Sequence, residues 1–520
     1  MNAAPLAVCL LSMGLAAPAA LGQESSGTDI GSRRQFWFNA QPLVAESSGL
    51  RIAQQRPVKN GKNPFLLGDR PWEGNIVQLY SCDVHHDPET GRWQMWYEGH
   101  PGCVLLCTAF SKDGLRWEKP SLGLETWKGS KDNNIILQTG YTDAHCAAIV
   151  KAPTEKDPAR KYKLYYWVGP QWMDSHIEPL GLKPAEVADA KAKIKPYKKN
   201  GHYVAFSSDG VTFTPRSDAP VLATSDFSTV LFDEQLGRYR SYHKIEHQLP
   251  GWKQIRRCMW ESQSDDGVTF EKSRLVLAPD EKDDTMAKTL YAADRVEFYG
   301  MHVWPQDGFY LGLVWIFTIT KVNPKYGMGW DDGHIQPHLI YSPDGLDWKR
   351  LPVREPFIPN GPEGSWDSGT LYSSGDHPVV LGNEVRFYYF GTNYTHGSTE
   401  PIVSAKNRSG FGVATLPRDR YVGWQAAKDS GTLLTKPITF SGKDLFLNVD
   451  ASHGVARVAL LSADNQPIPG FGLEECEPIK ADSLEQAVRW AGASASALAG
   501  KTVRLQFSLR QSTLYTWQFK

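Results

Sequence analysis

One short phrase returns four times along this chain and constrains its fold more than any other feature. Each copy has the form Ser-x-Asp-Gly and is followed by an aromatic residue. An Asp-Gly pair supplies the left-handed backbone of a tight hairpin, and the Ser and Asp side chains can bond the amides of the same turn. Each copy therefore predicts a hairpin between the third and fourth strands of a repeating sheet, with its aspartate in a structural role. The four copies are Ser111–Trp117, Ser207–Phe213, Ser264–Phe270 and Ser342–Trp348.

Repeats of this size that consist mostly of strands are typical of propeller blades. A degenerate fifth copy at 412–424 raises the predicted number of blades to five. The uneven spacing of the copies indicates insertions in loops on one face, where such folds place function. One insertion, 184–195, is rich in Ala and Lys and predicts a short helix that ends before Pro196.

The sequence pattern changes after Trp424: short segments of alternating hydrophobic and polar residues, typical of strands, recur between Gly and Pro turns. We therefore predict an all-β protein: a five-bladed β-propeller at 23–424, followed by a C-terminal β-sandwich at 425–520. Residues 23–70 form an N-terminal arm that helps to close the ring. The predicted role of the sandwich is packing against the propeller, with carbohydrate binding as the alternative.

Residues 1–22 are typical of a secretory signal peptide, because the apolar stretch from Leu6 to Ala17 is followed by small residues. No later stretch reaches the roughly 18 apolar residues of a membrane span, so we expect a protein that is secreted or periplasmic. The net charge of −1 offers no electrostatic reason to bind nucleic acid or an anionic membrane surface.

Six cysteines follow residue 22, which is too few for a disulfide scaffold in a chain of 520 residues. No Cys-x-x-Cys or His/Cys metal spacing is present, so the sequence predicts no metal cofactor. The segment His85-His86-Asp87 is better explained as the start of a turn, because alternate side chains of a strand point to opposite faces. A structural calcium ion or a water in the channel, near His145 and His396, is left open.

Acidic residues stand at the start of the first strand of every predicted blade. First strands line the central channel of a propeller, so these carboxylates should ring one mouth. Like charges that converge on a pocket raise some pKa values, which creates the proton donor and ionised base that glycoside hydrolysis needs. The candidates are Glu73, Asp143, Asp226, Asp294 or Glu297, and Asp367.

Aromatic and basic residues accompany the acids at this mouth. Aromatic residues make up 12% of the chain, including 18 Trp, and can stack on sugar rings as well as pack the sheets. The arginines Arg240, Arg256 and Arg257 could neutralise the acids or bind a sulfate or uronate. The predicted substrate-binding residues are Trp72, Arg257, Tyr299, Trp366, Tyr372 and His396, with Tyr291 nearby.

The repeated hairpins, the acids of the first strands and the following sandwich resemble the five-bladed propeller glycoside hydrolases. That group includes invertase-like fructosidases, the arabinanase and xylosidase family, and anhydrogalactosidases. The segments 354–369 and 412–423 are similar to a secreted branch of it. In the better-known members, acids of the first three blades act as base or nucleophile, pKa modulator and acid, which the resemblance maps onto Glu73, Asp143 and Asp226.

The chain departs from that group in several places. It lacks the fructosidase phrases Trp-Met-Asn-Asp-Pro-Asn-Gly and Arg-Asp-Pro. Its blade-one acid is Glu where that group usually has Asp, and its blade-three acid is Asp where that group usually has Glu. We therefore expect Glu73, Asp226, Glu297 and Asp367 as the working carboxylates, with Asp143 as modulator. The expected function is exo-acting hydrolysis of a poly- or oligosaccharide. A glycoside phosphorylase and a non-catalytic sugar-binding propeller are the alternatives.

Overall fold

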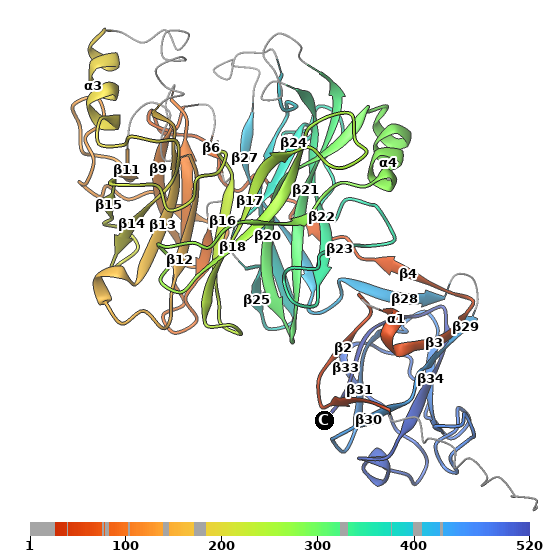
Figure 1. Cartoon of the computed structure of the whole chain (residues 1–520). Helices are drawn as coiled ribbons and strands as arrows, with labels where there is room; N and C mark the ends of the chain where they lie inside the picture. The colour runs from red at the N-terminus through yellow and green to blue at the C-terminus, as the bar shows by residue number, and fades with distance from the viewer. Residues whose placement is uncertain are drawn as a thin grey trace, which may run out of the picture.

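The protein is built almost entirely of β-strands, as a computed structural model shows (Figure 1). The all-β prediction is confirmed. The predicted helix is also present, as α3 (Pro184–Ile194); the other helices among the described residues are α1 (Ala40–Leu43), α4 (Glu281–Tyr291) and two short 3₁₀ segments. The structure describes residues 27–38, 40–74, 77–78, 83–101, 104–138, 145–170, 184–322, 331–375, 377–398, 408–426 and 430–520.

Strand pairing in the larger body forms five antiparallel units, which we number as blades one to five. Blade one contains β6 (Val77–Gln78), β7 (Val84–His86), β8 (Trp93–Gly99), β9 (Leu105–Ser111), β10 (Trp117–Glu118) and β11 (Ile135–Leu137). Blade two contains β12 (His145–Lys151), β13 (Tyr162–Val168), β14 (Gly201–Ser207) and β15 (Thr214–Arg216). Blade three contains β16 (Ser228–Asp233), β17 (Arg238–His247), β18 (Arg256–Ser264) and β19 (Arg274–Leu277). Blade four contains β20 (Arg295–Gln306), β21 (Phe309–Lys321), β22 (Asp332–Ser342) and β23 (Lys349–Arg350). Blade five contains β24 (Thr370–Ser373), β25 (Val379–Leu381), β26 (Glu384–Thr392), β27 (Ser409–Pro417) and β5 (Val58–Lys59).

Two features of this pairing close the ring. Blades four and five share one continuous sheet, joined by a parallel contact between Ile335 and Thr370. The outermost strand of blade five is β5, from the N-terminal part of the chain, which pairs with Ala414 and Thr415. The N-terminal arm therefore contributes to ring closure through its last strand.

The four Ser-x-Asp-Gly turns lie where the third strand of a blade meets the fourth. In blade three, the amide of Gly267 donates to Ser264 Oγ at 2.9 Å, and Asp266 Oδ1 accepts from the amides of Val268 and Thr269, each at 2.7 Å. The φ of Gly267 is +70°, the left-handed conformation that favours glycine. The other three turns repeat these bonds, so the predicted structural role of these aspartates is confirmed.

These turns also fasten neighbouring blades to each other. The carbonyl of the turn glycine accepts a hydrogen bond from an aromatic side chain on the second strand of the preceding blade. Tyr388 of blade five donates to Gly114 O of blade one, Trp96 of blade one to Gly210 O, Tyr165 of blade two to Gly267 O and Tyr242 of blade three to Gly345 O. The same short sequence thus builds a hairpin and joins it to the adjacent sheet.

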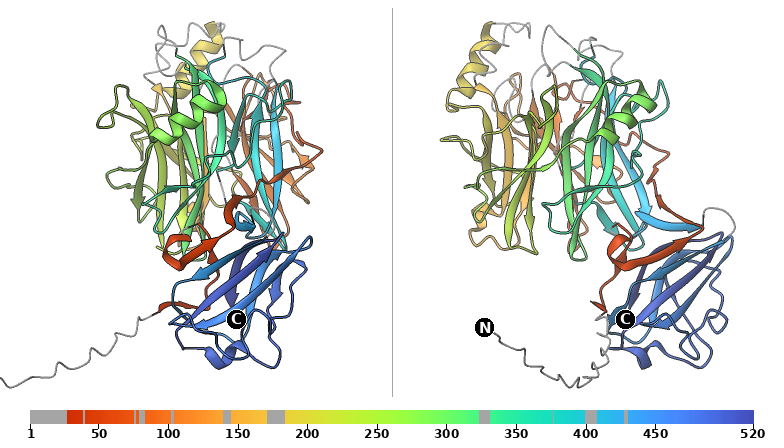
Figure 2. Two further views of the ribbon diagram at one scale, coloured as in Figure 1. Left: turned by 90° about the vertical axis from the view of Figure 1, so that its right-hand side faces the viewer. Right: turned by 45° about the vertical axis from the view of Figure 1, so that its right-hand side comes forward.

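The smaller body is a two-sheet sandwich that contains both ends of the described chain (Figure 2). Domain boundaries drawn from the sequence assigned residues 23–424 to the propeller, whereas residues 28–54 and 422–426 pair within the sandwich. One sheet contains β1 (Thr28–Gly31), β30 (Ile438–Phe440), β34 (Val503–Arg510), β29 (Ser430–Thr435), β3 (Val44–Ser48) and β32 (Val455–Ser462). The other contains β33 (Asp482–Ala487), β31 (Leu445–Asp450), β35 (Thr513–Phe519), β28 (Val422–Ala426), β4 (Leu50–Gln54) and β2 (Gln35–Phe36).

The sandwich packs against blades four and five through an apolar contact. The ring of Tyr421 lies 6.4 Å from that of Trp304 and 6.4 Å from that of Phe387. Phe38 packs on Phe309 at 5.7 Å. These residues belong to one continuous buried cluster, so the two bodies share a hydrophobic core at their contact.

Blade topology gives the ring two different mouths. The upper mouth, at the top of Figure 1, is the end where the innermost strands β6, β12, β16, β20 and β24 begin, and α3 lies at this end. The lower mouth is the end where these strands finish and where the Ser-x-Asp-Gly turns lie. Within the part of the chain that the structure describes, no helix has the length and apolar character needed to cross a bilayer.

Candidate active site at the upper mouth

Six of the predicted site residues come together at the upper mouth, on blades three, four and five. Asp226 precedes the innermost strand of blade three, and Arg257 lies on the third strand of that blade. Glu297 and Tyr299 lie on β20. We call this set the upper cluster; its members are Asp226, Arg257, Glu297, Tyr299, Tyr372 and His396.

Asp226 is the member of the cluster whose carboxylate reaches solvent. Its side chain is 32% exposed, and Oδ1 lies 2.7 Å from Lys244 Nζ. Lys244 is itself only 4% exposed and lies over the ring of Tyr299, with Nζ 4.0 Å from the ring centroid. The ion pair with this buried lysine fixes the position of the Asp226 carboxylate at the edge of the mouth.

Below Asp226 lies a chain of buried ion pairs. Glu297 is fully buried between Arg257, which contacts its Oε2, and Arg295, whose Nε lies 2.9 Å from its Oε1. Arg295 also contacts Asp331 Oδ2 at 2.7 Å. A buried carboxylate that is bonded to two guanidinium groups is neutralised where it lies, so Glu297 is placed to hold the arginines in position.

His396 joins blade five to this cluster. Its Nδ1 lies 2.9 Å from the carbonyl oxygen of Asp331, and its Nε2 lies 3.2 Å from Tyr299 Oη. Burial lowers the pKa of His396 to about 4, and the positive charges of Arg257 and Lys244 act in the same direction. The imidazole is therefore neutral at neutral pH and acts as a hydrogen-bonding group.

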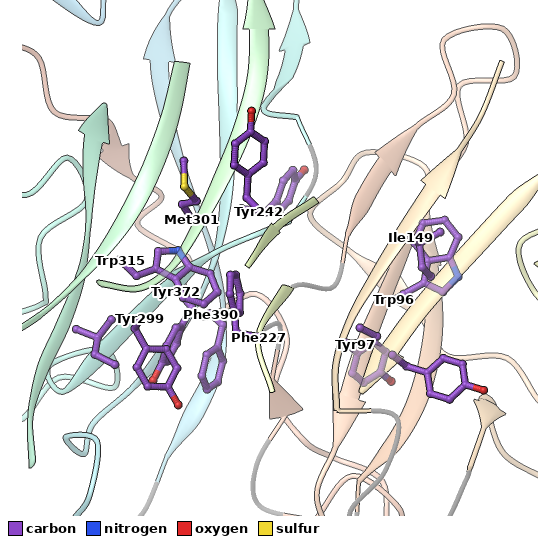
Figure 3. Close-up of a cluster of buried hydrophobic side chains, with 14 of the residues drawn as sticks. Trp96, Tyr97, Ile149, Phe227, Tyr242, Tyr299, Met301, Trp315, Tyr372 and Phe390 are labelled. Carbon is purple, nitrogen blue, oxygen red and sulfur yellow. The ribbon is translucent and has the colours of Figure 1, made fainter. Parts of the chain in front are cut away.

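The floor of the cluster is aromatic, as Figure 3 shows for Tyr299, Tyr372, Trp315 and Phe390. The ring of Tyr372 lies 5.9 Å from that of Tyr299, 4.8 Å from that of Trp315 and 5.7 Å from that of Phe390. Tyr372 is only 2% exposed. It thus supports Tyr299 from beneath and does not face the solvent of the mouth.

Glu73 and Asp367 also precede innermost strands, but their side chains turn into their own sheets. Glu73 is fully buried, lies 2.8 Å from Lys119 Nζ and accepts a hydrogen bond from Tyr97 Oη. Asp367 is 4% exposed and its Oδ2 lies 2.6 Å from Lys59 Nζ. Each lysine comes from the outermost part of the blade, so these two acids fasten inner to outer strands.

The Glu73–Lys119 and Asp367–Lys59 ion pairs, which we call the two locks of the mouth, share a sequence pattern that was not among the predicted motifs. In each, a Trp-acid pair meets a Tyr-x-Gly triplet on the second strand. The glycine is required because a Cβ at Gly391 would lie 2.8 Å from Asp367 Cβ and 2.9 Å from the Trp366 ring. The pairs are Trp72-Glu73 with Tyr97-Glu98-Gly99, and Trp366-Asp367 with Tyr389-Phe390-Gly391.

The side chains of Trp72 and Trp366, like those of the acids that follow them, pack within their own sheets. Trp72 Nε1 donates to Asn134 Oδ1 at 2.7 Å, and Trp366 stacks on Tyr389 with 5.8 Å between ring centroids. The structure therefore does not bring Trp72 or Trp366 to the upper cluster. Asp143, the predicted acid of blade two, lies outside the described residues.

Three charged or titratable side chains near this mouth, those of Lys244, Glu98 and His100, were not singled out from the sequence. Lys244 carried no signal beyond its place on the second strand of blade three. Glu98 and His100 form a buried pair at the end of β8, with 3.0 Å between Glu98 Oε2 and His100 Nε2. Their alternation within Tyr97-Glu98-Gly99-His100 was a detectable signal, because it places both side chains on the same face of the strand.

The described residues contain no group of three or more His, Cys, Asp or Glu side chains arranged to hold a metal ion. His85 and His86 pack on Trp96 and Trp93, with ring centroids 4.8 and 4.4 Å apart. The two imidazoles therefore contact different rings, as expected for neighbours in a strand. Cys107, Cys258 and Cys476 are buried.

No protein-family model matches this chain, and no curated protein matches it by sequence. Among solved structures, it is similar to one described as "Glycoside hydrolase", with 13% identity, 70% of this chain and 92% of that chain covered, and a TM-score of 0.44. It is also similar to an N-acetylgalactosamine deacetylase from F. plautii, with 16% identity, coverage of 71% and 96%, and a TM-score of 0.44. A third is the beta-1,2-mannobiose phosphorylase from Listeria innocua, with 9% identity, coverage of 70% and 97%, and a TM-score of 0.42. These names describe different chemistries and assign none of them to this chain.

Proposed function

We propose that this protein is a secreted glycoside hydrolase that removes sugar units from the end of a poly- or oligosaccharide at the upper mouth. One observation supports this most: Asp226, a partly exposed carboxylate, lies 2.7 Å from the buried Lys244 Nζ, and that ammonium group in turn lies over the ring of Tyr299. A carboxylate fixed in this way is what a glycosidase needs at the anomeric carbon, where positive charge develops in the transition state.

We assign the reacting role to Asp226, either as nucleophile or as the base that activates water. Lys244 keeps this carboxylate oriented. Glycoside hydrolysis needs a second carboxyl group to protonate the leaving oxygen. We propose Asp143, the acid predicted before the first strand of blade two, for this second carboxyl group, in place of the modulator role expected from the sequence.

Glu73, Glu297 and Asp367 take a different role in this proposal from the one expected from their positions in the sequence. Each is bonded to at least one buried or half-buried cation. A carboxylate that is fully desolvated and paired is poorly placed to exchange a proton with substrate. We therefore propose that these three acids position the strands and the arginines around the reacting centre.

The nearby cationic side chains are buried and already paired, which favours hydrolysis over phosphorolysis. A phosphorylase must keep positive side chains available for inorganic phosphate. Lys244 is 4% exposed and paired with Asp226, while Arg257 is 3% exposed and paired with Glu297. Both charges are already matched by a carboxylate, so water is the better-supported acceptor.

The exo-acting mode is proposed from the shape of the ring. A mouth that is walled by the ends of several blades admits the end of a sugar chain more readily than its middle. Secretion is proposed from the apolar segment Leu6–Ala17 and the small residues that follow it.

The proposal is tested by incubating the protein with a broad panel of neutral, uronic and sulfated oligosaccharides, with and without phosphate, and identifying the released sugars. We expect monosaccharide release from at least one substrate without a requirement for phosphate. Release of a sugar phosphate only when phosphate is present would replace hydrolysis by phosphorolysis. Binding of a glycan with no turnover across the whole panel would replace the enzyme by a sugar-binding protein.

A further inference from the structure

A cavity of about 290 Å³ opens at the lower mouth, at the opposite end of the ring from Asp226. Small-molecule pockets span about 300–1,000 Å³, so this cavity is close to the size that holds a single small ring. It is formed where the innermost strands of blades one, two and three end, together with the segment after β24. Its lining includes His86, Arg92, Trp96, Lys151, Tyr162 and Glu234.

The cavity is separate from the upper cluster. Asp226 precedes β16, and Phe232 and Glu234, which line the cavity, stand at the other end of the same strand. The six residues Ser228–Asp233 of this strand correspond to a rise of about 20 Å. A molecule in the cavity would therefore not touch Asp226.

Four polar side chains around the cavity, within the part of the chain that the structure describes, make no hydrogen bond or ion pair with the protein. They are the side chains of His86, Arg92, Lys151 and Glu234. Arg92 rests on the ring of Phe110, 4.0 Å from its centroid, and His86 packs on Trp93. Both groups are thus held in place while their nitrogen atoms stay available to a ligand.

Neighbouring polar groups in the lining are already engaged. Asp209 Oδ1 accepts from two amides of its own turn, and Trp96 Nε1 donates to Gly210 O. Gln94 Nε2 donates to Thr108 Oγ1 and to Gly210 O. The contrast separates groups that build the wall from groups that are available for binding.

The chemistry of the lining identifies the class of ligand. Tyr162 provides partly exposed aromatic surface, while the buried side chains of Trp96, Phe232, Val150 and Leu231 form apolar wall. The same lining contains hydrogen-bond donors on Arg92 and Lys151 and an acceptor on Glu234. The charged groups of the lining are of both signs, which disfavours a strongly charged ligand; they are Arg92, Lys151, Asp87, Asp209 and Glu234.

We propose that the lower-mouth cavity is a second, non-catalytic site that binds a neutral sugar ring. Aromatic faces contact the apolar side of such a ring, while Arg92, Lys151 and Glu234 bond its hydroxyl groups. This site would retain a carbohydrate at the end of the protein that faces away from the reacting carboxylate. It does not depend on the proposed hydrolysis, because binding here involves no bond cleavage.

The test measures binding of neutral monosaccharides, namely D-glucose, D-galactose, D-mannose, D-xylose and L-arabinose, by saturation-transfer NMR and calorimetric titration. Three variants are compared with the parent chain. Lys151→Ala/Glu234→Ala removes two groups of the cavity, Asp226→Ala alters the upper mouth, and Glu474→Ala/Lys480→Ala is an exposed control pair in the sandwich. Far-ultraviolet circular dichroism checks that each variant is folded.

We expect at least one sugar to bind the parent, the Asp226→Ala variant and the sandwich control with equal affinity. The cavity variant should bind that sugar at least tenfold more weakly and should keep the parent's turnover of any substrate found in the oligosaccharide panel. The proposal is overturned if no sugar in the set binds the parent. It is equally overturned if binding is lost in Asp226→Ala and retained in Lys151→Ala/Glu234→Ala, because the sugar then occupies the upper mouth alone.

Discussion

The outer hairpins and the upper mouth both take acidic residues from successive blades, yet they use them in opposite ways. In the hairpins, Asp113, Asp209, Asp266 and Asp344 make the same bonds to the amides of their own turns. At the mouth, the acids have different environments. Glu73 and Asp367 are paired with lysines, Glu297 lies between two arginines, and Asp226 is half-exposed.

This difference shows which repeated acidic residues have a purely structural role. A hairpin aspartate is satisfied within three residues of itself, so the same solution works in every blade. The mouth is one shared space, and identical charges from several blades would repel one another there. Each blade therefore supplies a different group, and the acid that is paired but still partly exposed, Asp226, is the candidate for chemistry.

The largest effect should follow from breaking a lock of the mouth. Lys119→Met leaves the fully buried Glu73 without its cation, and removing one partner of a buried ion pair costs about 3–5 kcal/mol. Urea denaturation of this variant, and of Lys59→Met in the matching lock of blade five, should show losses of this order. Lys131→Met, at an exposed position, is the control. Losses below about 1 kcal/mol in both lock variants would contradict the structural role of these acids.

The pH dependence of stability should separate the two regions. His396 has a folded pKa of about 4, below its ordinary value near 6.5, so the unfolded chain binds its proton first as pH falls. Its contribution to stability is present above pH 6.5 and is lost between about pH 6.5 and 4, by about 3 kcal/mol. Hydrogen bonds from turn amides hold the pKa of Asp266 down to about 2 despite the opposing effect of its partial burial, so that contribution is lost only below about pH 4.

Unfolding free energies at pH 7.5 and 4.5 check this separation. His396→Gln should flatten the loss of stability between the two pH values, whereas Asp266→Asn should leave that loss unchanged. An unchanged slope in His396→Gln would show that the imidazole is not held neutral by its surroundings.

A smaller effect is expected from the cation that orients Asp226. Lys244→Met should lower kcat by about tenfold, which corresponds to about 1.4 kcal/mol, with little change in the fold. Lys244→Arg should restore much of the activity, because it returns a positive charge beside the carboxylate. Steady-state kinetics on the substrate found in the oligosaccharide panel provide the measurement. Equal activity of the Met variant and the parent would remove Lys244 from the proposed site.

The smallest effect should come from removing one hydrogen bond between neighbouring blades. Tyr242→Phe removes the hydroxyl that donates to Gly345 O at 2.9 Å and should lower the free energy of unfolding by about 1 kcal/mol. Activity should remain near that of the parent. A loss of activity without a loss of stability would show that the hairpins are coupled to the site.

The hairpins and the helix of blade two could be predicted because their interactions are local. Asp266 bonds residues two and three positions away, and the helix predicted at 184–195 is present at Pro184–Ile194. Neither feature depends on knowing what lies across the ring. Four of the units followed from these local signals, since each of the four hairpins identifies the third and fourth strands of one blade.

The orientation of the acidic side chains at the upper mouth could not be predicted, because their partners are distant in sequence. Glu73 bonds Lys119, 46 residues away, and Asp367 bonds Lys59, 308 residues away. The sequence identified these acids as first-strand residues but carried no information about the lysine that would meet them. Similarly, β4 belongs to the sandwich because it pairs with β28, a strand from the other end of the chain.

The central claim, that chemistry is confined to the upper mouth while the hairpin acids are structural, is tested most directly by one kinetic comparison. The kcat of Asp226→Asn and of Asp266→Asn is measured on the same substrate, with stability measured in parallel. We predict that Asp226→Asn lowers kcat by about a hundredfold or more and remains folded. Asp266→Asn should lose about 1 kcal/mol of stability and keep the parent's kcat. Turnover by Asp226→Asn at the parent's rate would contradict the claim.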